Sequence, residues 1–291
     1  MPVSYEITLP KLPARPEDSH KGSFGSVLIV AGSRGMSGAA ALSGLGALRG
    51  GAGLVTVAVP AGIQEIVAAI EPSYLTLALS DDADGRISRR AQAEIVSLAR
   101  DATALAIGPG WGKSPDLSEL AHFLYGSIEK PLVVDADALN ALASLPGGVP
   151  KAPTGTSRIL TPHPGEFARL LKTQTKSVQQ DREALAAGFA REQGAIVILK
   201  GHRSVITDGE KIAVNTTGNS GMATGGTGDV LTGLVAALLA QGMAPFDAAH
   251  LGAYLHGLAG DLALTDLGAP GMIASDLPRY LGRAWKQVGA V

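Results

Sequence analysis

The chain has 291 residues, of which 46% are hydrophobic and 17% are charged, and its formal net charge is −2. This length exceeds the usual size of one domain but is common for a single α/β unit, so one domain over 1–291 with a large core is expected. The near-neutral charge argues against a broad nucleic-acid footprint, and the absence of cysteine excludes disulfides, thiol catalysis and thiolate metal sites.

The amino-terminal segment has no basic region followed by an apolar run, and no later segment is long and apolar enough to span a bilayer. A cytoplasmic location without membrane contact is therefore predicted. Residues 1–20 are rich in proline and polar side chains, which predicts an arm that does not form a buried strand. Two placements of this arm stay open, namely across its own domain or on a neighbouring subunit.

A repeating pattern of strand and helix begins at 26–31, a continuous apolar run typical of a buried parallel strand. Small residues over 32–53 then predict a turn and a closely packed helix. The next predicted elements are a strand at 54–59, a helix near 63–70, a strand near 74–79, a helix near 88–100 and a strand at 104–107. Such alternation indicates right-handed βαβ units in a mostly parallel α/β fold.

Two predicted strands run directly into loops that are rich in glycine or aspartate. The strand at 104–107 leads into 108–112, and the next strand leads into 135–140, whose sequence is Asp-Ala-Asp-Ala-Leu-Asn. Because ligands of an open parallel sheet collect at the carboxyl ends of its strands, these loops predict one shared crevice. Asp135 and Asp137 keep two interpretations here, either helix caps or ligands of a substrate or metal.

A conformationally restricted histidine follows the next strand, 158–160. In the segment 161–166, Thr-Pro-His-Pro-Gly-Glu, two prolines hold His163 in one pose before a helix begins. A histidine held at a strand end is more often functional than one on a helix face. His250 and His256 lie six residues apart on a later predicted helix and cannot share a face, so they are interpreted as ordinary core or surface histidines.

Lys200 follows the apolar strand 195–199. A lysine at the end of a buried strand suits a nucleotide phosphate, and a solvated surface lysine is the alternative. Strands at 205–207 and 211–214, joined by Asp-Gly, predict a hairpin directly after this segment. The remaining predicted elements are helices near 177–193, 246–264 and 275–288.

The segment 219–234 combines a glycine-rich loop with the start of a helix. Its glycines allow close approach of the backbone to a ligand, and the helix turns unpaired amides and its positive dipole end toward that ligand. A plain helix cap is the alternative, but a cap needs one residue, and five glycines fall within 218–228. The segment thus predicts a phosphate loop formed by Gly225, Gly226, Thr227 and Gly228. Asp229, in the first helical turn, is either a charge partner of the helix or a base facing the anion.

These motifs together resemble a known family. The Gly-Thr-Gly-Asp sequence that opens a late helix resembles the ribokinase-like superfamily, and the whole set resembles the ADP-dependent NAD(P)H-hydrate dehydratases. The segments that carry the resemblance, in the family's order, are 21–25, 31–33 with 37–40, 108–112, 135–140, 161–166, 200–204 and 219–229. At Ser204 and Thr227 the chain departs from the residue usual in the family, but both departures keep a hydroxyl group.

The resemblance implies a ribokinase-like three-layer α/β/α fold and the repair of hydrated NADH and NADPH. ADP would phosphorylate the C6 hydroxyl and phosphate would then leave, giving NAD(P)H, AMP and phosphate, with Mg²⁺ as cofactor. By position, the residues that contact the hydrated dinucleotide are Ala39, Gly112, His163 and Asp229, and Asp229 is the catalytic base. Those that contact the adenine nucleotide are Lys200, Gly201, His202, Arg203, Ser204 and Gly228. The metal ligands stay unassigned.

The resemblance also implies a homo-oligomer, most often a tetramer. Many relatives carry an amino-terminal epimerase domain, and about twenty residues before Lys21 are too few for one, so if the host has an epimerase it is expected to be a separate protein. One rival function is a kinase of a small alcohol such as hydroxyethylthiazole, which would share the phosphate loop but not the other motifs. A second rival is a non-catalytic nucleotide sensor, against which the intact Asp229 argues.

Overall fold

The computed structural model describes residues 3–11 and 15–289 and is built around one ten-stranded sheet with the order β1-β10-β9-β8-β7-β6-β5-β2-β3-β4. The strands are β1 (Ser4–Tyr5), β2 (Ser26–Val30), β3 (Leu54–Pro60), β4 (Leu75–Leu79), β5 (Ala104–Ile107), β6 (Leu132–Val134), β7 (Arg158–Leu160), β8 (Ile196–Leu199), β9 (Val205–Thr207) and β10 (Lys211–Val214). Within these residues every pairing is parallel except the two made by β9. The mostly parallel sheet is thus confirmed, as is the β9–β10 hairpin.

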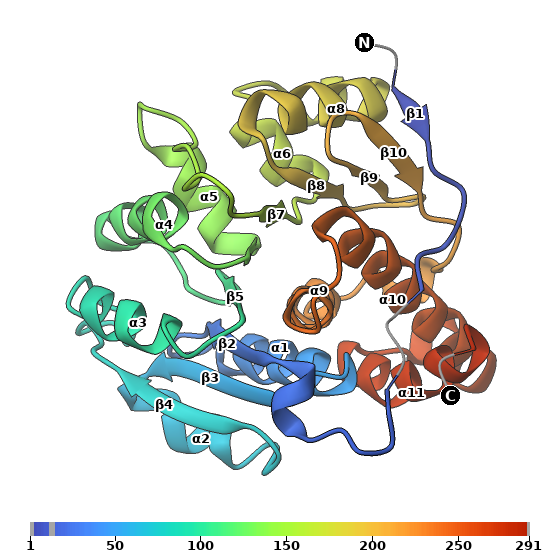
Figure 1. Cartoon of the computed structure of the whole chain (residues 1–291). Helices are drawn as coiled ribbons and strands as arrows, with labels where there is room; N and C mark the ends of the chain where they lie inside the picture. The colour runs from blue at the N-terminus through green and yellow to red at the C-terminus, as the bar shows by residue number, and fades with distance from the viewer. Residues whose placement is uncertain (1–2, 12–14, 290–291) are drawn as a thin grey trace.

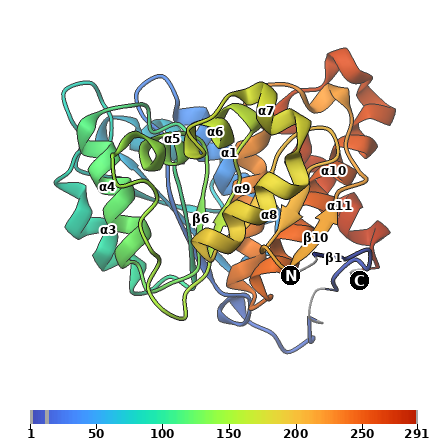
Figure 2. The ribbon, with the colours of Figure 1, turned by 90° about the horizontal axis from the view of Figure 1, so that it is seen from above.

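Helices cover both faces of this sheet (Figure 1). They are α1 (Ser37–Arg49), α2 (Gln64–Ala68), α3 (Ala91–Ala99), α4 (Pro115–Ser127), α5 (Ala136–Ser144), α6 (Pro164–Leu170), α7 (Thr175–Gln180), α8 (Arg182–Gln193), α9 (Thr227–Ala240), α10 (Pro245–Leu267) and α11 (Leu277–Gln287). Seen from above, α8 lies in front of the sheet and α9 lies behind it (Figure 2). The expected three-layer α/β/α arrangement is confirmed.

Each face of the sheet has its own hydrophobic core, which explains why central strands such as β5 and β6 have apolar residues facing both sides. In β2, Val27 and Ile29 face the core formed with α1, α9 and α10, whereas Leu28 and Val30 face the core formed with α3, α4 and α8. A strand covered on both faces cannot alternate apolar with polar residues. None of the helices in the part of the chain that the structure describes is long and apolar enough to cross a membrane.

The small residues of α1 allow it to lie directly against α9. A Cβ added at Gly46 would overlap the carbonyl oxygen of Val230, and one added at Gly233 would overlap that of Ser43. Because α9 carries the predicted phosphate loop at its amino end, this backbone-to-backbone contact sets the position of the loop relative to β2.

We expect Gly233→Ala to lower the free energy of unfolding by about 1–3 kcal/mol, because the added methyl group forces α1 away from α9. The matched control is Gly188→Ala in α8, where an added Cβ meets nothing within 4 Å. This change should stabilise by up to about 1 kcal/mol through helix propensity. Urea unfolding of both variants measures the difference. Equal changes in the free energy of unfolding would show that the close contact between α1 and α9 does not require glycine at 233.

Two helices differ from expectation. The predicted helix near 177–193 is divided at Asp181, whose ψ of 61° breaks the chain into α7 and α8. The helix α4 was not predicted from the sequence, although its start carries a recognisable signal: the Ser114 hydroxyl accepts a hydrogen bond from the Leu117 amide at 3.1 Å, and Pro115 occupies the first turn.

In the described residues, the amino-terminal arm packs on its own domain. Ser4–Tyr5 pairs in parallel with β10 as an exposed edge strand, so the arm does add a strand, though not a buried one. Further along, the guanidinium of Arg15 lies 3.6 Å from the Phe24 ring centroid and donates to the Gly51 carbonyl. Residues 1–2 and 12–14 of the arm, and 290–291 at the other end of the chain, lie outside the described residues.

Candidate active site

The glycine-rich segment forms a tight turn at the amino end of α9. Gly226 precedes the helix with φ +96°, a conformation that side chains other than glycine rarely adopt, and a Cβ there would come within 2.6 Å of Leu42 Cδ1. The backbone of the neighbouring Gly225 faces open space, with nothing within 4 Å of an added Cβ. The Thr227 hydroxyl donates to the Met222 carbonyl at 3.2 Å and closes the turn. The local geometry is that of an anion-binding helix terminus.

Asp229 lies in the first turn of this helix and is surrounded by other charges. Its pKa is raised to about 7, mainly by burial and then by the negative charge of Asp135, while the positive charge of Lys200 acts in the opposite direction. The charges of Asp137 and Glu166 also raise the pKa of Asp229, by smaller amounts. A carboxyl group that titrates near neutrality is a better proton acceptor than an ordinary aspartate.

Lys200 and Asp135 form a buried ion pair beside the loop. Lys200 Nζ donates to Asp135 Oδ1 at 2.6 Å, and the Thr232 hydroxyl donates to Asp135 Oδ2 at 2.7 Å. Asp135 makes no side-chain cap on α5, so the helix-cap interpretation is wrong for this residue. The Lys200 side chain is 20% exposed and its amine would lie 3.2 Å from a Cβ at Gly228, so the surface-lysine interpretation is wrong too.

The charge of this lysine is secured by its neighbours. Burial on its own would lower the pKa of Lys200, but the charges of Asp135 and Glu166 and the hydrogen bond to Asp135 outweigh it, and the pKa is raised. Lys200 therefore presents a permanent positive charge next to the amino end of α9.

His163 is held rigidly, as its flanking prolines predict, and Glu166 shares in holding it. His163 Nδ1 accepts from the Gly165 amide at 3.0 Å, so its proton lies on Nε2, which is 3.2 Å from Glu166 Oε1. Glu166 Oε2 in turn accepts from the His163 amide at 2.8 Å. Burial raises the pKa of Glu166 to about 7, against the opposing charge of Lys200. Sequence reasoning missed Glu166 as a site residue, although a glutamate three residues after a cap is a capping-box signal.

Ala39, in the first turn of α1, lies beside the loop after β5 that holds Gly112. A Cβ at Gly110 would come 2.8 Å from the Ala39 Cβ and 3.0 Å from the Met36 carbonyl oxygen, so the start of α1 touches the loop after β5. The Gly112 amide donates to Asp137 Oδ2 at 2.9 Å, which ties the same loop to α5. The two segments of the predicted crevice, 108–112 and 135–140, are therefore in contact. The second is not a loop as predicted, because α5 begins directly after Asp135.

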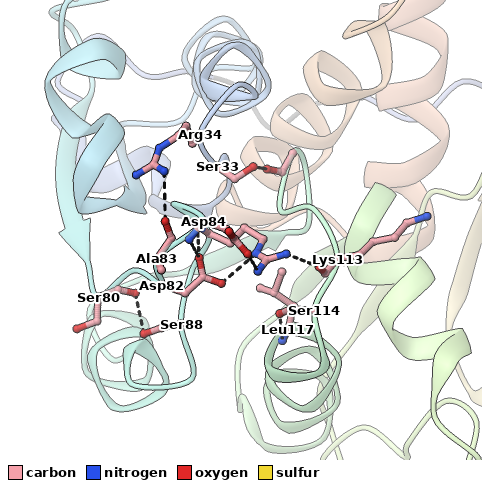
Figure 3. Close-up of polar contacts among 12 residues, drawn as sticks. Ser33, Arg34, Ser80, Asp82, Ala83, Asp84, Ser88, Lys113, Ser114 and Leu117 are labelled. Carbon is pink, nitrogen blue, oxygen red and sulfur yellow. Dashed lines mark hydrogen bonds and ion pairs between the residues drawn. The ribbon is translucent and has the colours of Figure 1, made fainter.

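A network of polar contacts supports this loop from outside (Figure 3). Arg86 Nη1 donates to the Lys113 carbonyl at 2.8 Å, while its Nε pairs with Asp82 at 2.9 Å. The Ser33 hydroxyl donates to the Gly110 carbonyl at 2.8 Å. The Lys113 side chain extends away from the acidic residues of this network (Figure 3).

The rest of the expected nucleotide segment forms the turn between β8 and β9. Arg182 anchors this turn by donating to the His202 and Leu199 carbonyls, and the Ser204 hydroxyl donates to the Gly201 carbonyl at 3.1 Å. The side chains of His202 and Arg203 are exposed, unlike Lys200.

His256 is a core histidine, as expected, but it supports the phosphate loop. Its Nε2 lies 2.8 Å from the Thr227 carbonyl oxygen. Burial lowers the pKa of His256 to about 4, so the ring is neutral at pH 7 and donates to this carbonyl through Nε2. No local sequence signal points to this contact, which joins residues 29 positions apart.

The loop, the buried carboxylates and the lysine at one edge of this sheet define a ribokinase-like protein. A solved structure titled ADP/ATP-dependent NAD(P)H-hydrate dehydratase, from Bacillus subtilis with ATP and Mg²⁺, superposes with a TM-score of 0.80 at 31% identity over 95% of this chain and 94% of that one. A ribokinase-like superfamily protein from Enterococcus faecalis gives 0.78 at 27% identity, over 94% and 92% of the two chains.

A family model described as NAD(P)H-hydrate dehydratase matches residues 27–283. The ADP-dependent (S)-NAD(P)H-hydrate dehydratase of Neisseria meningitidis serogroup B is 40% identical over 276 residues, 91% of this chain and 86% of that protein. The chain belongs to the NAD(P)H-hydrate dehydratase family, which confirms the resemblance. It spans about half the length of bifunctional relatives such as the NAD(P)H-hydrate repair enzyme Nnr of Moorella thermoacetica, which is 46% identical over 93% of this chain and 51% of the relative.

Proposed function

We propose that the chain catalyses ADP-dependent dehydration of hydrated NADH and NADPH, giving NAD(P)H, AMP and phosphate. The observation that carries this proposal is Asp229, a carboxyl group with a pKa of about 7 at the amino end of α9, where Lys200 and the loop amides face the same space. A pure nucleotide sensor has no need of such a base. Membership of the dehydratase family argues against a kinase of a small alcohol.

In the first step, Asp229 accepts the proton of the C6 hydroxyl group while the oxygen of that hydroxyl attacks the β-phosphorus of ADP. The bond from this phosphorus to the bridging oxygen breaks and AMP leaves. The amides at 226–228 stabilise the charge that develops on the transferring group, and Lys200 adds a positive charge at Gly228. In the second step, the C6–O bond breaks with help from the ring nitrogen, C5 loses a proton, and phosphate departs.

The other site residues keep the roles given by the resemblance. Ala39, Gly112 and His163 would contact the hydrated dinucleotide, and the contact between the start of α1 and the loop after β5 supports a shared binding surface. The segment 200–204 and Gly228 would contact the adenine nucleotide, which the approach of Lys200 to Gly228 supports.

Mg²⁺ fits this arrangement as a partner of the nucleotide. Among the described residues no group of three or more histidine, aspartate and glutamate side chains is arranged to hold a metal ion. Mg²⁺ is commonly held by one or two carboxylates together with substrate phosphates, and Asp137 and Glu166 supply such oxygen donors. When bound, the ion would neutralise charge on the phosphates of ADP. The proposal places the protein in the cytoplasm as one catalytic domain that forms a homotetramer, and light scattering measures the subunit number.

The decisive experiment mixes the purified protein with hydrated NADH or NADPH and with ADP, ATP or no nucleotide. Recovery of the reduced-nicotinamide absorbance together with equal amounts of AMP and phosphate is expected with ADP. Transfer of phosphate to a small alcohol without recovery of absorbance would support the kinase instead. Binding of nucleotide without any turnover would support the sensor.

The pH dependence of kcat/KM offers a further prediction. Because Asp229 must be ionised to accept a proton, kcat/KM should rise as the pH increases through about 7. Glu166→Gln removes one negative charge that raises the pKa of Asp229, so the midpoint should move to lower pH. Profiles of both proteins with saturating ADP test this, and an unmoved midpoint in the variant contradicts the coupling.

A further inference from the structure

A cleft of about 600 Å³ opens between α4, α5 and the side chain of Arg169 on α6. One end is formed by Gly112 and Asp137, which belong to the crevice already described, and the other by Arg169 and Asn140. Asp137 lies close enough to Asp229 for its charge to act on that carboxyl group. The cleft is therefore an extension of the reaction site, and its size is that of a typical small-molecule pocket.

Two cations and a helix terminus make the wall of this cleft positive. Lys113 and Arg169 line it, and neither forms an ion pair within the part of the chain that the structure describes. The Arg169 guanidinium is held by one hydrogen bond, from Nη1 to Asn140 Oδ1 at 2.8 Å. Ser114 and Pro115, at the amino end of the 13-residue helix α4, add the positive end of its dipole.

The rest of the lining suits a flat, mostly apolar group. Leu117, Ala141 and Ala143 contribute apolar surface, and Ser118 and Ser144 supply hydroxyl groups. A cleft with one apolar side, and with two cations against the single carboxylate of Asp137, fits a nucleoside that carries an extra phosphate better than a neutral nucleoside. The cations can form charge-assisted hydrogen bonds with the oxygens of the extra phosphate, and a neutral nucleoside offers no such partner.

We propose that this cleft holds the adenosine half of the hydrated dinucleotide, and that Arg169 and Lys113 bind its 2′-phosphate, so that the protein prefers the hydrate of NADPH over that of NADH. This inference rests on the proposed function. Asn140 acts as a positioning residue, because its side-chain oxygen orients the guanidinium of Arg169.

The first test compares the two hydrates as substrates of the wild type, Arg169→Gln and Lys113→Gln. The wild type is expected to have the lower KM for hydrated NADPH. Arg169→Gln should raise that KM by at least about tenfold, the loss expected for one charge-assisted hydrogen bond, while the KM for hydrated NADH and both kcat values change little. The control is Arg100→Gln, an exposed arginine at the carboxyl end of α3, which should alter neither KM.

An equal rise in the KM for both hydrates in Arg169→Gln would show that the cations bind the pyrophosphate or support the fold, and would overturn the assignment. An unchanged KM for hydrated NADPH would overturn it as well. A second measurement needs no turnover, so it separates this inference from the proposed function. Calorimetric titration should show NADP⁺ binding more tightly than NAD⁺ to the wild type and equally to Arg169→Gln. If the wild type binds both equally, the inference fails whatever the enzyme activity.

Discussion

Asp229→Asn is expected to fold normally and to lose about 10²–10⁴-fold in kcat, the usual contribution of a general base. The amide keeps the shape of the side chain but cannot accept the proton of the C6 hydroxyl. Stability should not fall, because the ionised carboxylate lies near the negative charge of Asp135 and its removal relieves that repulsion. Single-turnover rates with hydrated NADH and ADP, together with thermal unfolding, measure the two effects.

A matched control for Asp229→Asn is Asp266→Asn. Asp266 is an aspartate on the exterior of α10, 43% exposed and paired with Arg283 at 2.7 Å. Losing this charge should leave kcat unchanged, since surface ion pairs contribute little. Near-normal turnover in Asp229→Asn would remove this residue from the mechanism. A fall in melting temperature would mean that its carboxylate stabilises the fold.

Lys200→Met is expected to have two separate consequences. It leaves the Asp135 carboxylate, which is 1% exposed, without its cation, so the free energy of unfolding should fall by about 3–5 kcal/mol. It also removes the positive charge beside Gly228, so the dissociation constant of ADP should rise by roughly 10–150-fold, or about 1.5–3 kcal/mol. Urea unfolding and calorimetric titration with ADP measure these separately, and binding of the hydrated dinucleotide should change little.

The double variant Lys200→Met with Asp135→Asn separates the two roles of the lysine. Asparagine removes the unpaired charge and its side-chain oxygen still accepts from the Thr232 hydroxyl, so most of the stability should return. Binding of ADP should stay weak, because the cation is still missing. If ADP binding recovers along with stability, Lys200 is a structural residue and its place in the nucleotide site is wrong.

Much of the fold follows from local patterns in the chain. Apolar runs such as Val27 to Val30 in β2 predict buried strands because a strand covered on both faces needs apolar residues on both. The Asp-Gly turn predicts the β9–β10 hairpin because only a few residue pairs suit its backbone. Likewise, Gly226 predicts the turn before α9 because that turn needs a positive φ, and Asp229 follows it within one helical turn.

Contacts between distant segments were decided by the tertiary structure alone. Lys200 and Asp135 are 65 residues apart in the sequence. They meet because Asp135 follows β6 and Lys200 follows β8, the two strands that flank β7 in the sheet, and no local pattern encodes this strand order. The same holds for Thr232, whose hydroxyl completes the surroundings of Asp135 from α9.

The chemical character of the site divides in the same way. The sequence by itself determined which residue types stand at the carboxyl ends of the strands and at the start of α9, since turns, caps and strand ends depend on neighbouring residues. Only the tertiary structure decided that Asp229 and Glu166 titrate near pH 7, because desolvation and the field of surrounding charges are sums over groups from many segments. For the same reason, the positive cleft beside Gly112 exists only once α4, α5 and α6 have packed together.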